Sequence, residues 1–210
     1  MIYIYRRIFN LLKIRNKGKN NTIHLSKMCY LRKKSRIRIN GNDNNVYIDD
    51  GIYKDININI VGDNNTIKIL NTTRINDLKI IIQNNFNSVT IGKNVAFTKS
   101  LIVSCGKNNH ILIDDDCMIS TNTEIWGCDG HSILKDGEII NLSKSIYIGK
   151  HTWIGANAKI LKGANIQENC VIGANSLVTS GKIKNNSLIA GNPAKIIKEN
   201  ITWVVDNLEN

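Results

Sequence analysis

Aliphatic residues recur at a strict interval of six in the C-terminal half of the chain. The series comprises Ile148, Ile154, Ile160, Ile166, Ile172 and Val178. A small residue follows four positions after each of the first five, in the order Thr152, Ala158, Ala164, Cys170 and Ser176. Helices and half-buried strands have shorter periods, so neither explains this interval. The interval predicts a solenoid with three faces per coil, in which the aliphatic residue fills each face and the small residue fits the corner.

A longer repeat of the form Gly-x-Asn/Asp-Asn precedes these hexapeptides. Full copies begin at Gly18, Gly41, Gly62 and Gly106, and a degenerate copy begins at Asn84. Successive copies start 23, 21, 22 and 22 residues apart. Three faces of six residues make a coil of about eighteen. Each unit is therefore interpreted as one coil with a few additional residues at one corner. We therefore expect one solenoid over residues 20–192.

Both ends of the chain suggest short helices. Residues 1–19 place apolar side chains at helical spacing among basic ones, which predicts a basic N-terminal helix that caps the first coil, or alternatively contacts a membrane surface or partner. Residues 193–210 begin with the only proline and predict an amphipathic C-terminal helix that covers the last coil.

One segment interrupts the six-residue pattern. The spacing from Ile125 to Ile148 is 23, and the residues between them are rich in Gly, Asp, Ser and Lys. We expect an exposed loop over about 126–147 that leaves the coil. Solenoids place such excursions on one face, which is commonly the binding face.

The positive charge is concentrated near the N-terminus. The net charge is +11, and residues 1–40 contain twelve Lys or Arg and no Asp or Glu. This region is either a solvated basic face or a contact for an anionic polymer or membrane surface. Nucleic acid is not expected as a partner, because none of the recognised binding modules is present.

The five cysteines suggest a reducing compartment. They form no C-x-x-C pair, their number is odd, and Cys117 and Cys170 occupy the small-residue position of the hexapeptide. We therefore expect no disulfide framework. With no signal peptide or membrane span visible in the sequence, the chain is expected in the cytoplasm, with peripheral attachment at the inner membrane as an alternative.

Histidine is the principal candidate for catalysis. His131 lies in the interrupting loop between Gly130 and Ser132, where substrate could reach an imidazole that titrates near neutral pH. The other histidines, His24, His110 and His151, lie in the repeats, where a structural or exposed position is the default. No phosphate-binding loop, nucleophile elbow or metal-ligand spacing is present, and nothing specifically activates Cys128, which lies three residues before His131, as a nucleophile.

The C-terminal hexapeptides resemble those of the hexapeptide-repeat acetyltransferases. The similarity covers about residues 89–203 and rests on W153-I-G, V171-I-G-A and A190-G-N-P-A-K, with G130-H-S and K135-D-G-E similar to the catalytic loop. It implies an all-β fold, the left-handed parallel β-helix, and a homotrimer that binds acetyl-CoA between neighbouring subunits and needs no metal. His131 matches the general base. The residues that match cofactor contacts are Trp153, Ala156, Ala174, Thr179, Ser180, Lys195 and Lys198.

The resemblance leaves the partner of His131 open, since Asp129, Glu124, Asp136 and a main-chain carbonyl are all candidates. It predicts an acetyl-CoA-dependent O-acetyltransferase acting on a bacterial surface sugar or polysaccharide. The basic N-terminal region further suggests an anionic acceptor such as a sialic acid polymer. The alternatives are N-acetylation of an amino sugar or nucleotide-sugar, and a non-catalytic binding solenoid.

Overall fold

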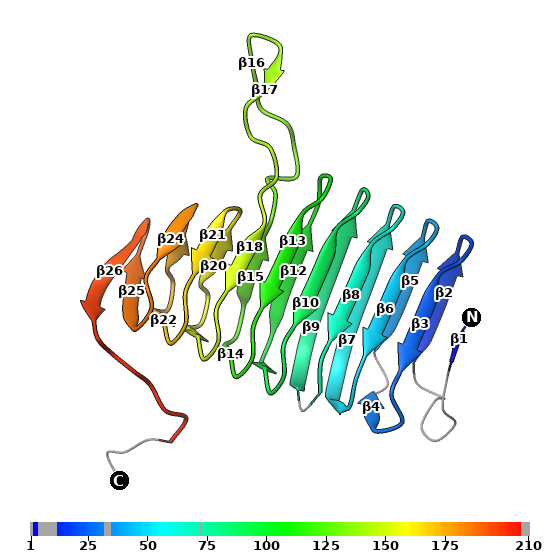
Figure 1. Ribbon diagram of the computed structural model, residues 1–210, viewed down its shortest axis with the longest axis horizontal. Coiled ribbons are helices and arrows are strands. Elements are labelled where there is room, and N and C mark those ends of the chain that lie inside the picture. The colour runs from blue at the N-terminus through cyan, green and yellow to red at the C-terminus, as the bar shows by residue number, and fades with distance from the viewer. Residues whose placement is uncertain (1, 4–11, 32–34, 72, 207–210) are drawn as a thin grey trace.

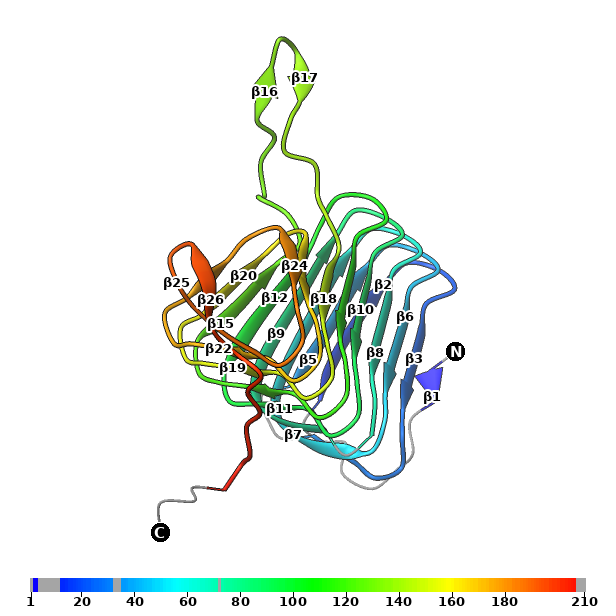
Figure 2. The same ribbon diagram turned by 60° about the vertical axis from the view of Figure 1, so that its left-hand side comes forward.

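The chain winds as a solenoid of short parallel strands with one long excursion (Figure 1). The computed structural model describes residues 2–3, 12–31, 35–71 and 73–206. Successive strands pass through three faces, which enclose a single apolar core (Figure 2).

Face one contains nine parallel strands in hydrogen-bonded order. They are β1 (Ile2–Tyr3), β3 (Thr22–Leu25), β6 (Asn45–Ile48), β8 (Thr66–Ile69), β10 (Ser88–Ile91), β13 (His110–Ile113), β18 (Ile146–Ile148), β21 (Ala164–Ile166) and β24 (Gly181–Ile183). Two long strands, β7 (Gly51–Val61) and β9 (Thr73–Gln83), run from face two onto face three and join those faces into one sheet.

Faces two and three hold the remaining strands of the solenoid. On face two these are β4 (Cys29–Leu31), β11 (Ala96–Phe97), β14 (Met118–Ile119), β19 (Trp153–Ile154), β22 (Val171–Ile172), β25 (Ser187–Gly191) and β26 (Ala194–Glu199). On face three these are β2 (Lys13–Lys17), β5 (Arg36–Asn40), β12 (Ser100–Ser104), β15 (Thr123–Trp126), β20 (Lys159–Leu161) and β23 (Leu177–Val178). The excursion carries an antiparallel hairpin of β16 (Leu134–Lys135) and β17 (Glu138–Ile139).

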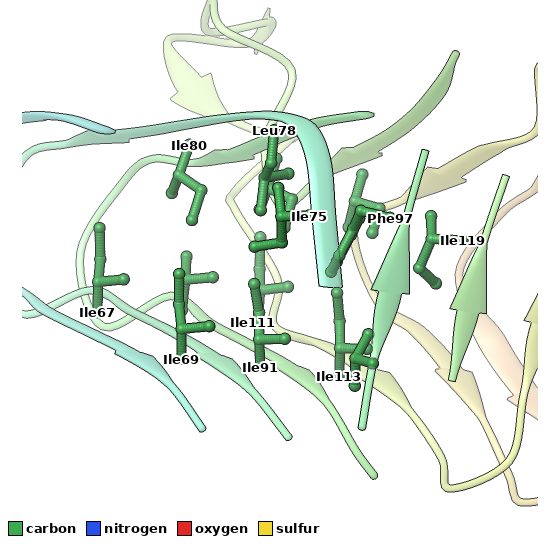
Figure 3. Packing of buried hydrophobic residues seen from close by; sticks show 14 of the residues in the cluster. Ile67, Ile69, Ile75, Leu78, Ile80, Ile91, Phe97, Ile111, Ile113 and Ile119 are labelled. Atoms are coloured by element: carbon green, nitrogen blue, oxygen red, sulfur yellow. The ribbon is translucent and has the colours of Figure 1, made fainter. Parts of the chain in front are cut away.

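The hexapeptide prediction is confirmed at the core. All six residues of the aliphatic series from Ile148 to Val178 are at most 2% exposed, and the five small residues are at most 1% exposed. In-register pairing places identical residues of successive coils above one another, so Ile69, Ile91 and Ile113 form one buried column (Figure 3). Each fully buried aliphatic side chain contributes about 1.5–3 kcal/mol relative to exposure.

The Gly-x-Asn/Asp-Asn repeat forms the corner between faces three and one. A side chain at Gly41 would lie 2.0 Å from the oxygen of Gly62, so only glycine permits the coils to stack there. The last residue of each copy is buried, and these residues form a ladder of Asn21, Asn44, Asn65, Asn87 and Asn109. The side-chain oxygen of Asn44 accepts from the Asn65 main-chain N–H at 2.9 Å, and the same contact recurs from Asn65 to Asn87. The ladder thus supplies hydrogen-bond acceptors for main-chain N–H groups at the corner, where the chain turns between two faces.

The expectation of a C-terminal helix is wrong. Residues 194–199 form strand β26, which pairs antiparallel with β25. The last coil leaves an unpaired strand edge, and satisfying it outweighs a modest helical propensity. Beyond the strand, the chain returns along the solenoid, and the Trp203 indole stacks on His151 and donates to its main-chain oxygen at 2.8 Å.

The N-terminal helix expected over residues 1–19 is absent from the described residues of that range, 2–3 and 12–19. Residues 13–17 form strand β2, which pairs with β5, and Ile2–Tyr3 pairs with β3. Residues 4–11 lie outside the described part of the chain. These strands extend the sheets of the solenoid by one more coil. Pairing with a neighbouring strand satisfies their main-chain N–H and C=O groups.

Candidate active site

The excursion leaves the solenoid where the asparagine ladder ends. After β15 the chain reaches Gly127, whose oxygen accepts from the Asn109 side chain at 2.9 Å. A side chain at Gly127 would lie 2.4 Å from the Asn109 side-chain oxygen. The chain then leaves the coil and returns at β18, and the hairpin of β16 and β17 lies far from the solenoid (Figure 1). The ladder therefore anchors the base of the excursion.

A hydrogen-bond network holds the two arms of the excursion together near its base. The Asn141 side-chain N–H donates to Asp129 Oδ2 and to the main-chain oxygen of His131, each at 2.8 Å. Its oxygen accepts from the Ile133 N–H at 2.6 Å. Lys162, from the next coil, donates to Asp129 Oδ2 at 2.6 Å and to the Asn141 main-chain oxygen at 2.7 Å. The network thus fixes the main chain of His131 while its side chain stays exposed.

The same contacts determine the ionisation of Asp129. Partial burial alone would raise the pKa of this carboxyl, but hydrogen bonds from Lys162 and Asn141, together with the Lys162 charge, outweigh it and hold the pKa below its usual value. Asp129 is therefore a carboxylate committed to Lys162 and Asn141. Glu124, another candidate partner of His131, accepts from the Trp126 indole at 2.9 Å and pairs with Lys159.

A hollow of about 400 Å³ lies beside His131. It is bordered by both arms of the excursion, including Asp129, Asn141 and Leu142, and by the neighbouring coils at Asn84 and Lys107. An imidazole at the rim of a polar hollow is accessible to a hydroxyl-bearing acceptor, which a general base requires.

The expectation of no disulfide is wrong, because Cys105 and Cys128 are bonded, with Cα atoms 5.7 Å apart. Their separation of 23 residues equals one coil of the looser repeat, so the two side chains stack at the same corner of adjacent coils. The spacing of 23 residues indicates this pairing, whereas the C-x-x-C motif applies only to cysteines close together in the sequence. Cys29, Cys117 and Cys170 are free and buried. A bonded Cys128 is not a nucleophile.

Three of the predicted cofactor residues lie along the edge between faces two and three. Ala156 and Ala174 occupy equivalent corners of successive coils, where the Asn175 N–H donates to the Ala156 oxygen at 2.9 Å. Gly173, beside Ala174, lies close to Ala190 of the last coil, because a Cβ atom placed on Gly173 would lie 2.9 Å from the Ala190 Cβ. Ala190 is in turn paired with Lys195, so the edge ends at this lysine. Small residues and a terminal cation are a suitable lining for a narrow chain that ends in phosphates.

The other predicted cofactor residues lie elsewhere. Thr179 and Ser180 are exposed at the corner between faces three and one, and Lys198 pairs with Leu188 at the last coil. Trp153 lies on face two, where its indole donates to Ser120 at 3.2 Å and its ring lies 6.0 Å from that of Trp203. The C-terminal segment is therefore its neighbour in this chain.

Sequence reasoning missed Asn141 and Lys162. Neither belongs to a recognisable motif, since Asn141 is one of many asparagines and Lys162 occupies an ordinary outward hexapeptide position. Their role in holding the base of the excursion is visible only from the contacts between the excursion and the next coil. The described residues contain no cluster of three or more His, Cys, Asp or Glu that could hold a metal ion. No membrane-spanning helix occurs in the described ranges.

The sequence and the fold are similar to those of known acetyltransferases. The family described as "Bacterial transferase hexapeptide (six repeats)" matches residues 145–180. A polysialic acid O-acetyltransferase of Neisseria meningitidis is 34% identical over 189 residues, covering 89% of this chain and 86% of that protein. The crystal structure of the polysialic acid O-acetyltransferase OatWY superimposes with a TM-score of 0.82 at 31% identity, covering 93% of each chain.

The polySia-specific acetyltransferase NeuO also matches, with a TM-score of 0.82 at 29% identity over 94% of this chain and 90% of that one. These similarities cover the N-terminal coils as well as the hexapeptides. The chain therefore belongs to the hexapeptide-repeat O-acetyltransferases and has their left-handed parallel β-helix fold.

Proposed function

We propose that this enzyme transfers an acetyl group from acetyl-CoA to a hydroxyl of an anionic bacterial surface polysaccharide of the polysialic acid type. The similarity to enzymes named for polysialic acid supports this acceptor, because it extends over nearly the whole chain. The concentration of Lys and Arg in residues 1–40 supports an anionic acceptor independently.

The main support for the mechanism is the position of His131. Its main-chain oxygen is held by Asn141, and the residue borders an open hollow. A neutral imidazole accepts the proton of the acceptor hydroxyl while that oxygen attacks the thioester carbonyl. The C–O bond forms, the C–S bond breaks, and CoA leaves as a thiolate that takes up a proton. Orientation of both substrates supplies the remaining advantage.

The edge formed by Ala156, Ala174 and Lys195 suits the donor. Acetyl-CoA supplies the activated acyl group, and the small side chains leave the main chain accessible to its pantetheine arm. Lys195 would attract the phosphates. Thr179, Ser180, Lys198 and Trp153 stay proposals for further contacts, in the positions described above.

A homotrimer completes this proposal. His131 lies beyond the edge between faces three and one, whereas Ala156 and Ala174 lie on the opposite edge of face three. Two copies side by side would bring one copy's imidazole to the other copy's donor edge. The exposed Ile133, Leu134, Ile139, Ile140 and Leu142 of the excursion fit a contact with a second copy. We place the reaction in the cytoplasm, where acetyl-CoA is available.

The direct test is His131→Ala, assayed with labelled acetyl-CoA and polysialic acid. The expected result is a loss of about 10²–10⁴-fold in kcat with unchanged thermal unfolding. His110→Ala is the matched control, since that imidazole lies on the solenoid and is hydrogen-bonded to Ser88 at 2.9 Å. Release of the label by mild alkali identifies an ester. Normal turnover in the His131 variant would refute the assignment, and alkali-stable label would indicate an amide.

A further inference from the structure

Face three carries a block of cationic side chains in its N-terminal coils. Strand β2 presents Lys13, Arg15 and Lys17, and its register with β5 aligns Lys13 with Arg36 and Arg15 with Arg38. All five are exposed. In the same columns, β7 presents Asn57 and Asn59, and β9 presents Lys79 beside Asn57. Parallel pairing therefore gathers charges that lie far apart in the sequence.

These cations are not neutralised within the described part of the chain. The ion pairs found there lie elsewhere and involve Lys150, Lys159, Lys162 and Lys184. The nearest carboxylates in the strand register, Asp55 and Asp77, lie at the corner with face two. An uncompensated positive surface of this kind attracts an anionic partner at long range.

Three cations of the block, Arg36, Arg38 and Lys79, line an open hollow on the way to the active site. The hollow, about 380 Å³, is lined by Arg36, Arg38, Asn57, Ile58, Asn59, Lys79 and Ile81. Ile81 also packs against the cluster of Val103, Cys105 and Cys128 on the same face. Cys105 and Cys128 in turn border the hollow beside His131. One surface thus leads from the cationic block to the candidate base.

We propose that this cationic block of face three, centred on Arg36, Arg38 and Lys79, binds a stretch of the anionic polysaccharide distant from the sugar that is acetylated. The guanidinium groups suit carboxylates because they present paired donors in a fixed plane. The amides of Asn57 and Asn59 donate to and accept from sugar hydroxyls. This inference rests on the proposed function for its acceptor, and adds a binding surface outside the reacting site.

The test reverses two charges in the block. Arg36→Glu combined with Arg38→Glu should raise KM for long polysialic acid about tenfold and leave kcat nearly unchanged. A short oligosialic acid that does not reach the block should show little change in KM. The matched control is Lys68→Glu with Arg74→Glu, which changes net charge equally on faces one and two, where both side chains are exposed. The milder Arg36→Gln with Arg38→Gln should give a smaller increase.

A binding measurement separates this inference from the proposed reaction. Affinity electrophoresis in gels containing polysialic acid should show weaker retardation of the reversed variant than of the wild type and the control. Equal retardation, or equal increases in KM for both double variants, would overturn the surface assignment while leaving acetylation intact. Failure of the wild type to acetylate polysialic acid would instead refute the proposed function. Binding to anionic phospholipid vesicles but not to polysialic acid would assign the block to a membrane and overturn the inference.

Discussion

The Asn141 side chain donates a hydrogen bond of 2.8 Å to the main-chain oxygen of His131. It thereby joins the outgoing and returning arms of the excursion, ten residues apart in the chain. This contact transmits the rigidity of the solenoid to the candidate base, because Lys162 from the next coil holds the same asparagine.

Replacing Asn141 by Ala should lower kcat by about 10–100-fold, because a misplaced base loses the alignment that the reaction needs. Lys162→Met should act in the same direction. The described structure gives both residues contacts with the base of the excursion rather than with the core, so thermal unfolding should change little. Steady-state kinetics with a full pH profile checks this, and Lys135→Ala at the hairpin is the control. Unaltered kcat in Asn141→Ala would show that the network does not position His131.

Acidification should loosen the base of the excursion. Because the folded-state pKa of Asp129 lies below its ordinary value of 3.8, its stabilising contribution is complete above that value. It is lost as the pH falls through the lower folded-state pKa. The Asn141 side-chain amide resonances, followed by NMR against pH, should shift in this acidic range. Asp129→Asn should abolish that shift, and its persistence in the variant would assign it to another group.

The five cysteines should differ sharply in reactivity. Without reductant, iodoacetamide should label none of them in the folded protein, because two are bonded and three are buried. Burial raises the pKa of Cys117 to about 12, which leaves almost no thiolate at neutral pH. After mild reduction, Cys105 and Cys128 should be labelled before the other three, because both border the hollow beside His131, and peptide mass spectrometry would show this order. Labelling of either residue before reduction would contradict the disulfide.

Removing the Asn65 side chain should destabilise the solenoid by about 3 kcal/mol. Asn65→Ala leaves the Asn87 main-chain N–H and the Asn84 oxygen without their partners, and each buried unsatisfied group costs about 1–3 kcal/mol. Urea unfolding monitored by circular dichroism measures the difference. Gln83→Ala, an exposed polar truncation on the same corner, should cost far less. Similar losses in both variants would show that the ladder adds no stability of its own.

The sequence alone determined the solenoid, because a period of six and a coil repeat of about 22 residues permit few other folds. It also located the excursion and its histidine, since both interrupt a regular pattern. The C-terminal end was predicted wrongly, because the local spacing of apolar residues does not show that the last coil leaves an unpaired strand edge. Residues 194–199 pair with that edge as a strand.

Only the tertiary structure decided what depends on contacts between coils. These contacts are the ion pair of Asp129 with Lys162, the pairing of Cys105 with Cys128, and the alignment of Arg36 and Arg38 with Lys13 and Arg15. The physical reason is common to all three. Stacking brings residues one coil apart in the sequence within bonding distance, and the exact coil length sets which side chains meet.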